Sequence, residues 1–180
     1  LSCPARLREG LIHFAARDAL AIEGLGPKLV DQLIAKGLVK NPADLYRLSI
    51  EDLITLERVG KKRATKLYTA LENSKNSSLT RLIFALGIRH VGQEVARLLA
   101  TKFGSLDALQ KATVSELLEI QGIGEEIAQS IRDFFAKEQN LKTIKKLKDA
   151  GLNLQAEATA QGKKLENLTF VLTGKLETLT

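Results

Sequence analysis

With 180 residues, 44% of them apolar, the chain can build a hydrophobic core, which excludes wholesale disorder. No apolar run approaches the roughly 18 residues that a membrane span needs, and the single cysteine excludes an internal disulfide framework, as expected of a protein in the reducing cytoplasm. The net charge is +6, and its excess lies between residues 56 and 103, where ten Lys and Arg accompany three Asp and Glu. A local excess of this kind suits a polyanionic partner, although a solvated helix face has the same composition.

Helix signals dominate the first 150 residues, where the alternation typical of strands is nearly absent. A proline stands at three expected helix starts, in the first turn that tolerates a missing N–H: Pro4, Pro27 and Pro42. Capping boxes at 49–52 and 113–116 begin two short helices, and Gly104 and Gly151 follow apolar runs as C-terminal caps do. Apolar residues three and four apart predict longer helices over 61–74, 93–102, 125–137 and 141–150. The predicted fold class is therefore all-α.

One motif occurs four times along this helical stretch. It reads Φ-x-G-Φ-G-x-x-x-Φ, where Φ is apolar, and we name its copies hairpin 1 (residues 22–30), hairpin 2 (56–64), hairpin 3 (88–96) and hairpin 4 (120–128). The second glycine recurs in steps of 34, 32 and 32 residues, at Gly26, Gly60, Gly92 and Gly124. A near-constant step marks repeated supersecondary units, each too small to bury its apolar face alone. We expect four units of a short helix, a tight loop and a longer helix.

The two glycines of the motif have different expected roles. The first, present as Gly24 and Gly122, permits a positive φ in the tight loop. The second stands at the start of a helix, where main-chain N–H groups lack partners and the helix dipole favours an anion. A single copy is explained equally well by a tight helix-to-helix turn. Four copies, with cations directly after two of the loops, favour phosphate binding instead.

The four copies are not equivalent. Arg58 and His90 replace the first glycine in hairpins 2 and 3, so we expect those loops to be built differently. Glu125 and Glu126 follow the glycines of hairpin 4 and would repel phosphate. We therefore expect hairpins 2 and 3 to contribute most of the binding and hairpin 4 to be mainly structural. His90 suits either a phosphate contact or a satisfied loop histidine, and His13, next to Phe14, suits packing.

The predicted DNA-binding set combines the loop glycines with the nearby cations. It comprises Gly24, Gly26, Lys28, Arg58, Gly60, Lys61, Lys62, Arg89, His90, Gly92, Gly122 and Gly124. These contacts would hold phosphates without reading bases, so binding should be sequence-blind and should weaken steeply with salt. No residue pairs a nucleophile with a base in the way that covalent catalysis needs, so we expect no catalytic residue.

The composition changes after Gly151. Residues 152–164 are small and polar, which is typical of a linker. Residues 168–173 give the one convincing strand, an isolated β-strand that is marginal without partners. We expect residues 165–180 to be the truncated start of an α/β domain, and the absence of a first methionine leads us to expect a piece of a longer protein.

Several motifs appear in the order found in one family. The segments "CPA", "HFAARDALAIEGLG", "NPADLYRL", "LERVG", "ALGIRHVG", "FGSLDAL", "IQGIG" and "FVLTGKL" together resemble the C-terminal half of bacterial NAD-dependent DNA ligase. The resemblance implies tandem helix-hairpin-helix repeats over 17–151, preceded over 1–16 by the end of a zinc finger and a connecting helix. It further implies the start of a BRCT domain over 165–180. It also implies that Cys3 is the last of four zinc ligands, the other three of which precede this chain.

The resemblance implies a function for the whole enzyme and a narrower one for this chain. The enzyme would seal nicks in duplex DNA during replication and repair, using NAD and magnesium, with zinc in its finger. The chain lacks the adenylation domain, so it should be inactive alone and hold no cofactor. Its expected partner is duplex DNA that carries a nick, bound by a monomer in the bacterial cytoplasm, where the enzyme would act at the nucleoid. No membrane association is expected.

Three alternatives belong to other classes of protein. The first is a DNA-binding accessory domain of another repair or junction-processing protein. The second is a base-excision glycosylase with Asp31 or Asp44 as its catalytic aspartate, although both stand in the wrong context. The third is a protein-interaction scaffold, which would have no reason to bind duplex DNA with a steep salt dependence.

Overall fold

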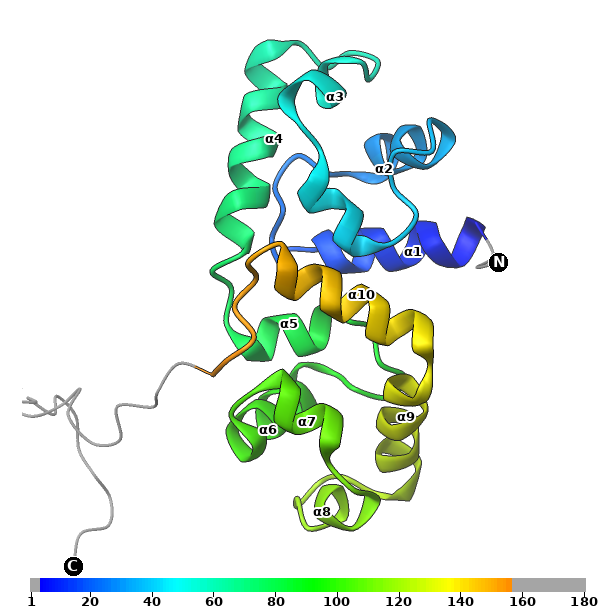
Figure 1. The fold of residues 1–180 in the computed structure, drawn as a ribbon, viewed down its shortest axis with the longest axis vertical. Coiled ribbons are helices and arrows are strands. Elements are labelled where there is room, and N and C mark those ends of the chain that lie inside the picture. The colour runs from blue at the N-terminus through cyan, green and yellow to red at the C-terminus, as the bar shows by residue number, and fades with distance from the viewer. Residues whose placement is uncertain (1–3, 157–180) are drawn as a thin grey trace, which may run out of the picture.

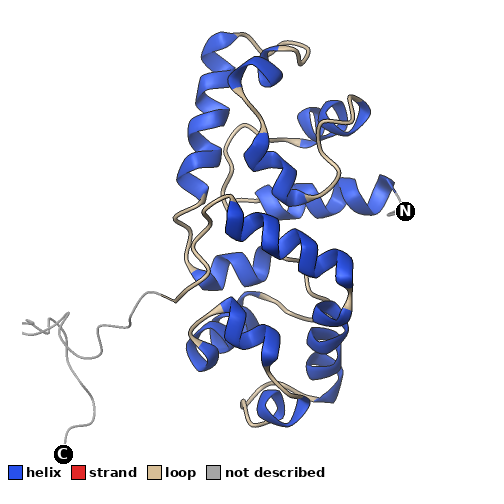
Figure 2. Ribbon diagram, in the orientation of Figure 1, coloured by secondary structure: helices blue, strands red, loops and turns tan. Residues whose placement is uncertain are grey.

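The computed structural model describes residues 4–156, which form an array of helices without a strand in that range (Figure 1). The helices are α1 (Pro4–Ala15), α2 (Pro27–Ala35), η1 (Pro42–Arg47), α3 (Ile50–Ile54), α4 (Lys61–Ser74), α5 (Leu79–Ala85), α6 (Gln93–Phe103), α7 (Leu106–Lys111), α8 (Val114–Leu118), α9 (Glu125–Ala136) and α10 (Glu138–Asp149). Figure 2, coloured by secondary structure, shows helices and loops and no strand in residues 4–156. The all-α prediction is confirmed.

The helix starts follow the local chemistry of the sequence. Each of the three prolines stands at the first position of a helix, as predicted, and both capping boxes form. Gly104 ends α6 in the left-handed conformation, with φ of 66°. The last helix begins three residues earlier than predicted, at Glu138, because its first turn is polar and gives no apolar periodicity.

The core is aliphatic and continuous through the described residues. Leucine, isoleucine, valine and alanine fill it, with Phe14 and Phe135 as its buried aromatic residues. His13 lies beside this core, where its Nε2 is 2.8 Å from the carbonyl oxygen of Phe84 and its ring meets the Phe84 ring edge to face at 4.8 Å. The packing role predicted for His13 is confirmed.

Two halves of similar build make up the molecule. Helices α1 to α4 hold hairpins 1 and 2, and helices α5 to α9 hold hairpins 3 and 4 (Figure 1). Helix α10 returns from the second half and packs on η1 in the first. The side chain of Arg81, on α5, donates hydrogen bonds to the carbonyl oxygens of Ala19 and Arg17, which fixes the chain just ahead of hairpin 1. The two halves are thus tied together at these two places and where His13 of α1 contacts Phe84 of α5.

Residues 152–156 depart from the predicted linker. The N–H of Leu106 donates to the carbonyl oxygen of Leu154 at 2.9 Å, and the N–H of Ala156 donates to that of Gly104 at 2.8 Å. Leu152 and Leu154 are buried, so alternate leucines anchor this segment to α7 and its neighbours. The small, polar composition of the predicted linker gave no indication of this packing. The rest of the predicted linker, the predicted strand at 168–173 and Cys3 lie outside the described residues.

Candidate nucleic-acid interface

The four hairpin loops share one turn. In each, the N–H of the second apolar residue donates to the carbonyl oxygen of the first, at 3.3, 3.2, 3.1 and 3.0 Å in hairpins 1 to 4. Both apolar residues are buried in every copy, as predicted: Ile22 and Leu25, Leu56 and Val59, Ile88 and Val91, Ile120 and Ile123. The residue at the ninth motif position is also buried in all four: Val30, Ala64, Ala96 and Ala128. Three buried side chains therefore fix each loop against its own helix.

The third residue of every turn has a positive φ. Gly24 and Gly122 have φ of 89° and 96°, as predicted for glycine, and Arg58 and His90 have φ of 60° and 63°. The expectation that Arg58 and His90 make differently built loops is therefore wrong. Burial of the two flanking apolar residues fixes the same turn in all four copies, and the non-glycine residues adopt the left-handed region to satisfy it.

The second glycine of each hairpin has an ordinary backbone. Gly26, Gly60, Gly92 and Gly124 have φ between −82° and −93° and an extended ψ, which any residue adopts. A Cβ placed on any of the four would meet no atom of the described residues within 4 Å. The fold itself does not require glycine at these positions, although each is a helix N-cap.

The N-cap glycines contrast with the caps of the short helices. Ser49, Ser78 and Thr113 each accept a hydrogen bond from the helix they precede, whereas the glycines starting α2, α4, α6 and α9 offer no side chain for this. Among the hydrogen bonds of residues 4–156, none uses the main-chain N–H of Lys61 or Lys62. Each hairpin thus leaves the positive end of its second helix open to an external acceptor.

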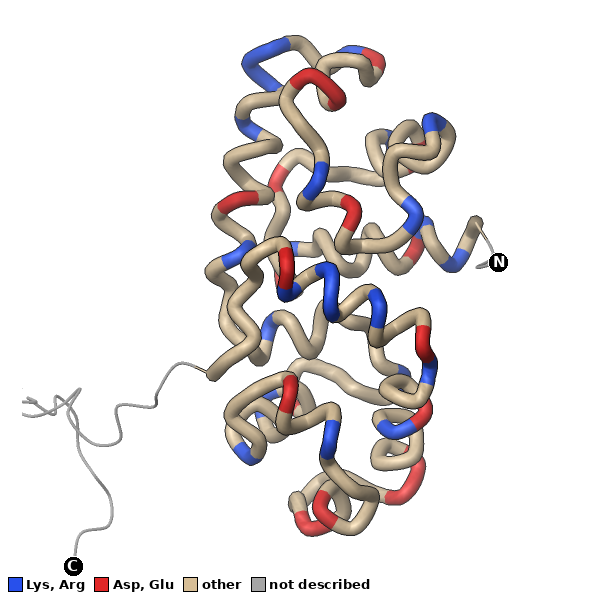
Figure 3. Tube along the Cα trace, viewed as in Figure 1, with Lys and Arg blue, Asp and Glu red and all other residues tan. Residues whose placement is uncertain are grey.

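Cations without acidic partners gather around hairpin 2 (Figure 3). Within the described residues no acidic group lies within ion-pair distance of Arg58, Lys61, Lys62, Arg63 or Lys66, and all five are exposed. The same holds for Lys28 at the start of α2 and Arg89 on hairpin 3.

Other cations of the region from 56 to 103 are engaged. Lys75, Arg97 and Lys102 form ion pairs with Glu72, Glu94 and Glu119. On α10, Lys142, Lys146 and Lys148 are likewise paired, with Glu138, Asp44 and Asp107. Within the region from 56 to 103, the cations without ion pairs are therefore concentrated where α3 leads into α4, with Arg89 on hairpin 3 as a further one.

His90 connects hairpins 3 and 4. Its Nε2 lies 3.1 Å from Oε1 of Glu126, in the first turn of α9. The sequence left two roles open for His90, a phosphate contact or a loop histidine satisfied by the protein. In the structure the protein itself supplies the partner, as in the second role. The contact also places an acidic side chain beside hairpin 3, where a phosphate was expected.

Sequence reasoning missed one concave feature beside hairpin 1. A groove of about 1220 Å³ separates the loop at 20–24 from α4, and its charged lining residues, Glu23, Lys62, Arg63, Lys66 and Arg81, lie among neutral polar and apolar ones. The signal was present as hydroxyl and amide residues spaced by four along α4, but periodicity assigns these to a solvent face without revealing a facing loop.

The candidate catalytic aspartates have structural partners. Asp31 accepts a hydrogen bond from Nε of Arg8 at 2.6 Å. Asp44 accepts from the N–H of Lys40 and from the side chains of Asn41 and Lys146. Burial opposes ionisation of Asp44, but these donors outweigh it and lower its pKa. Asp31 thus links α2 to α1, and Asp44 links η1 to α10.

Across residues 4–156, no group of three or more His, Cys, Asp or Glu side chains is arranged to hold a metal ion. In the same range, no helix is both long and apolar enough to cross a membrane.

Comparison with known proteins agrees with this geometry. Residues 16–73 match the family described as a SAM-like helix-hairpin-helix tandem, and residues 81–144 match the helix-hairpin-helix motif family. The two matches coincide with the two halves of the molecule.

The similar relatives are bacterial DNA ligases. The chain is 54% identical over 179 residues to a DNA ligase of Pelotomaculum thermopropionicum, which covers 98% of this chain and 26% of the relative. It is 51% identical over 176 residues to that of Geobacter metallireducens, with coverage of 98% and 26%. For the DNA ligase of Carboxydothermus hydrogenoformans the identity is 50%, with coverage of 99% and 27%. The chain spans about a quarter of the length of these relatives, and its sequence and fold fit a tandem helix-hairpin-helix fragment of a bacterial DNA ligase.

Proposed function

We propose that this chain grips duplex DNA by its sugar-phosphate backbone, as the helix-hairpin-helix part of an NAD-dependent ligase that seals nicks in replication and repair. One observation carries the proposal. All four long hairpin helices begin with glycine at positions where the backbone is ordinary and no described residue occupies the space of a side chain. Glycine there leaves room for a bulky ligand against the main chain.

The binding chemistry follows from the hairpin geometry. A phosphate oxygen in front of Gly60 would accept hydrogen bonds from the N–H groups of Lys61 and Lys62, at the positive end of the α4 dipole. The ammonium groups of the same two residues would add charge attraction. Contacts of this kind fix position on DNA and carry no base information. Hairpins 1 and 3 would add weaker contacts, through Gly26 with Lys28 and through Gly92 with Arg89.

The remaining parts of the proposal concern the whole enzyme. We assign NAD, magnesium and zinc to the full-length ligase, with Cys3 as one zinc ligand, since residues 4–156 offer no metal-binding cluster of their own. By this proposal residues 17–151 are the DNA-binding domain, and residues 165–180 begin a BRCT domain. The chain alone would be a catalytically inactive monomer, and the enzyme would act on the bacterial chromosome in the cytoplasm.

Charge reversal at hairpin 2 tests the proposal. Replacing both residues, Lys61→Glu and Lys62→Glu, should lower the slope of log affinity against log salt by about two, one per phosphate contact. Affinity should fall by more than tenfold at low salt, for nicked and intact duplex alike. Fluorescence anisotropy at two salt concentrations measures both quantities.

A matched control carries the same charge change on another surface. Lys142→Glu with Lys145→Glu alters two exposed lysines of α10. Binding by this control should stay within about threefold of the unmodified chain. Equal losses in the two double variants would show that net charge alone drives binding, and a salt-independent affinity would favour a protein-interaction scaffold.

A further inference from the structure

The groove beside hairpin 1 has a counterpart in the second half of the molecule. Gly60 and Gly124 are 64 residues apart, so Lys62, Thr65, Lys66 and Thr69 on α4 correspond to Glu126, Gln129, Ser130 and Asp133 on α9. Gly26 and Gly92 are 66 apart, so Glu23 and Gly24 correspond to Arg89 and His90. These corresponding residues line two separate hollows, here named groove 1 (hairpin 1 and α4) and groove 2 (hairpin 3 and α9).

The two grooves differ in charge arrangement and in size. In groove 2 the loop carries Arg89 and His90, while α9 carries Glu126 and Asp133 and has Lys137 as its C-cap. His90 and Glu126 join the two walls at 3.1 Å. Groove 2 measures about 520 Å³, against about 1220 Å³ for groove 1. In groove 1 the helix carries the cations, and none of Lys62, Arg63 and Lys66 has an acidic partner among the described residues. Groove 2 is bridged and balanced, whereas groove 1 is open and positive.

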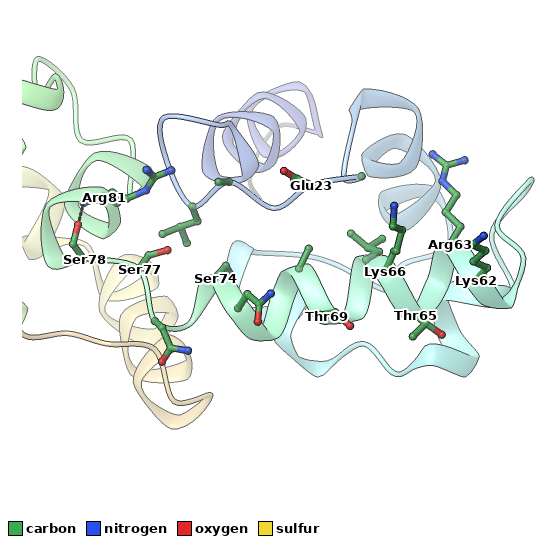
Figure 4. Close-up of a pocket in the computed structure, with 17 residues that line it drawn as sticks. Glu23, Lys62, Arg63, Thr65, Lys66, Thr69, Ser74, Ser77, Ser78 and Arg81 are labelled. Carbon is green, nitrogen blue, oxygen red and sulfur yellow. Dashed lines mark hydrogen bonds between the residues drawn. The ribbon is translucent and has the colours of Figure 1, made fainter.

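Figure 4 shows how groove 1 is built. Arg63 and Lys66 rise from α4 toward the wall formed by hairpin 1, where Glu23 lies, and Arg81 stands at the far end. Arg81 is a positioning residue, since its guanidinium is held by the carbonyl oxygens of Ala19 and Arg17. The surface between them combines the exposed polar side chains of Thr69 and, one turn later, Asn73 with apolar residues that include Leu67 and Ala70.

We infer that groove 1 receives the phosphodiester backbone of the DNA strand that passes hairpin 2. This inference rests on the proposed function and extends it beyond the hairpin loops. Charge complementarity selects the occupant: three cations without acidic partners face the hollow, against the one carboxylate of Glu23. From Lys62 to Asn73 the helix rises about 17 Å, at 1.5 Å per residue. That length equals about five base pairs of duplex at 3.4 Å each. Hydroxyl and amide side chains along it suit phosphate and sugar oxygens.

A substitution at Lys66 tests groove 1 independently of hairpin 2, because Lys66 lies in the second turn of α4, beyond the open N–H groups. Lys66→Gln in the full 180-residue chain should lower the salt slope by about one and weaken duplex binding roughly five- to tenfold at 0.1 M salt. Lys145→Gln removes the same charge from exposed α10 and should change affinity by less than about twofold. Urea unfolding should place both variants within about 0.5 kcal/mol of the unmodified chain, as usual for surface substitutions.

Photocrosslinking provides a direct readout of contact. A benzophenone amino acid in place of Thr69 should crosslink to duplex DNA, and the same group in place of Lys145 should not. Groove 1 is excluded as a backbone site if Lys66→Gln behaves like Lys145→Gln and the group at position 69 gives no crosslink. Gly60→Ser, measured in parallel, distinguishes the two proposals. If this variant alone weakens binding, the hairpin site is supported and groove 1 is rejected as a DNA site. Failure of the unmodified chain to bind duplex DNA would overturn both.

Discussion

The third residue of each hairpin turn shows where the backbone strain of the hairpins lies. At the third position of the turn, φ lies between 60° and 96° in all four copies. Glycine adopts this region freely, whereas Arg58 and His90 adopt it at a cost of about 1–2 kcal/mol each. The second glycines have no such requirement, since their φ values are ordinary. In a loop with two glycines, the first thus permits the positive φ of the turn. The second leaves the start of the following helix open to an external acceptor.

Hairpin 4 offers a matched pair for this distinction. Gly122→Ser places a side chain at φ of 96° and should destabilise the fold by about 1 kcal/mol. Gly124→Ser, two residues later, meets no described atom within 4 Å and supplies an N-cap hydroxyl, so it should stabilise by a few tenths of a kcal/mol. Urea unfolding of the two variants measures the difference. Losses of similar size would mean that both glycines are conformational.

The sequence predicted the glycine half of this pattern and missed the other half. Gly24 and Gly122 announce a positive φ because glycine is the residue that tolerates it. Arg58 and His90 carry no such signal, since nothing in a single sequence marks a non-glycine residue forced into the left-handed region. Their conformation follows from the burial of Leu56 with Val59 and of Ile88 with Val91 in separate parts of the core. Tertiary packing decides it, not local preference.

At the scale of helices, short helices begin with side-chain caps, whereas the helices that follow the hairpin loops begin with glycine caps. Short helices α3, α5 and α8 begin with a capping hydroxyl, which is worth about 1 kcal/mol to each. The helices that follow the loops forgo this gain. The sequence predicted both capping boxes because their pattern is local. It did not predict the contact of η1 with α4, which joins residues far apart in the chain.

Tyr46 of η1 takes part in the contact between η1 and α4. Its hydroxyl is 2.8 Å from Oγ of Ser74 at the end of α4, and that Oγ donates to the carbonyl oxygen of Leu71, so Tyr46 is the donor. Burial is the largest cause of the raised pKa of Tyr46, about 12. A folded pKa above the unfolded value of 10 means that this stabilisation is complete below pH 10 and is lost between pH 10 and 12.

Substitution should remove this part of the pH dependence. Tyr46→Phe should lower the free energy of unfolding at pH 8 by about 1 kcal/mol, through the lost hydrogen bond. Between pH 10 and 12 the unmodified chain should lose on the order of 2 kcal/mol more than the variant does. The other tyrosine, exposed Tyr68, provides the control, since Tyr68→Phe should keep the alkaline loss. Parallel curves for Tyr46→Phe and the unmodified chain would contradict this account.

At the scale of the molecule, the two halves share one build but differ in how their charged side chains are paired. Both halves repeat the same hairpins, and α10 ties them by packing on η1, with Nζ of Lys146 3.2 Å from Asp44. The first half keeps its cations unpaired around α4, whereas the second engages His90 with Glu126. Acids and bases could be counted from the sequence, but their pairing could not, because Lys146 and Asp44 are 102 residues apart.

The central claim is that the glycine-capped helix starts are vacant for a phosphate. The most direct measurement compares stability with DNA affinity for Gly60→Ser combined with Gly92→Ser. A serine at each N-cap would turn its hydroxyl onto the open N–H groups and fill the space in front of them. The account predicts an unfolding free energy that is unchanged or raised by a few tenths of a kcal/mol, with duplex affinity lowered by about tenfold or more. Full affinity in a variant of equal or greater stability would contradict it.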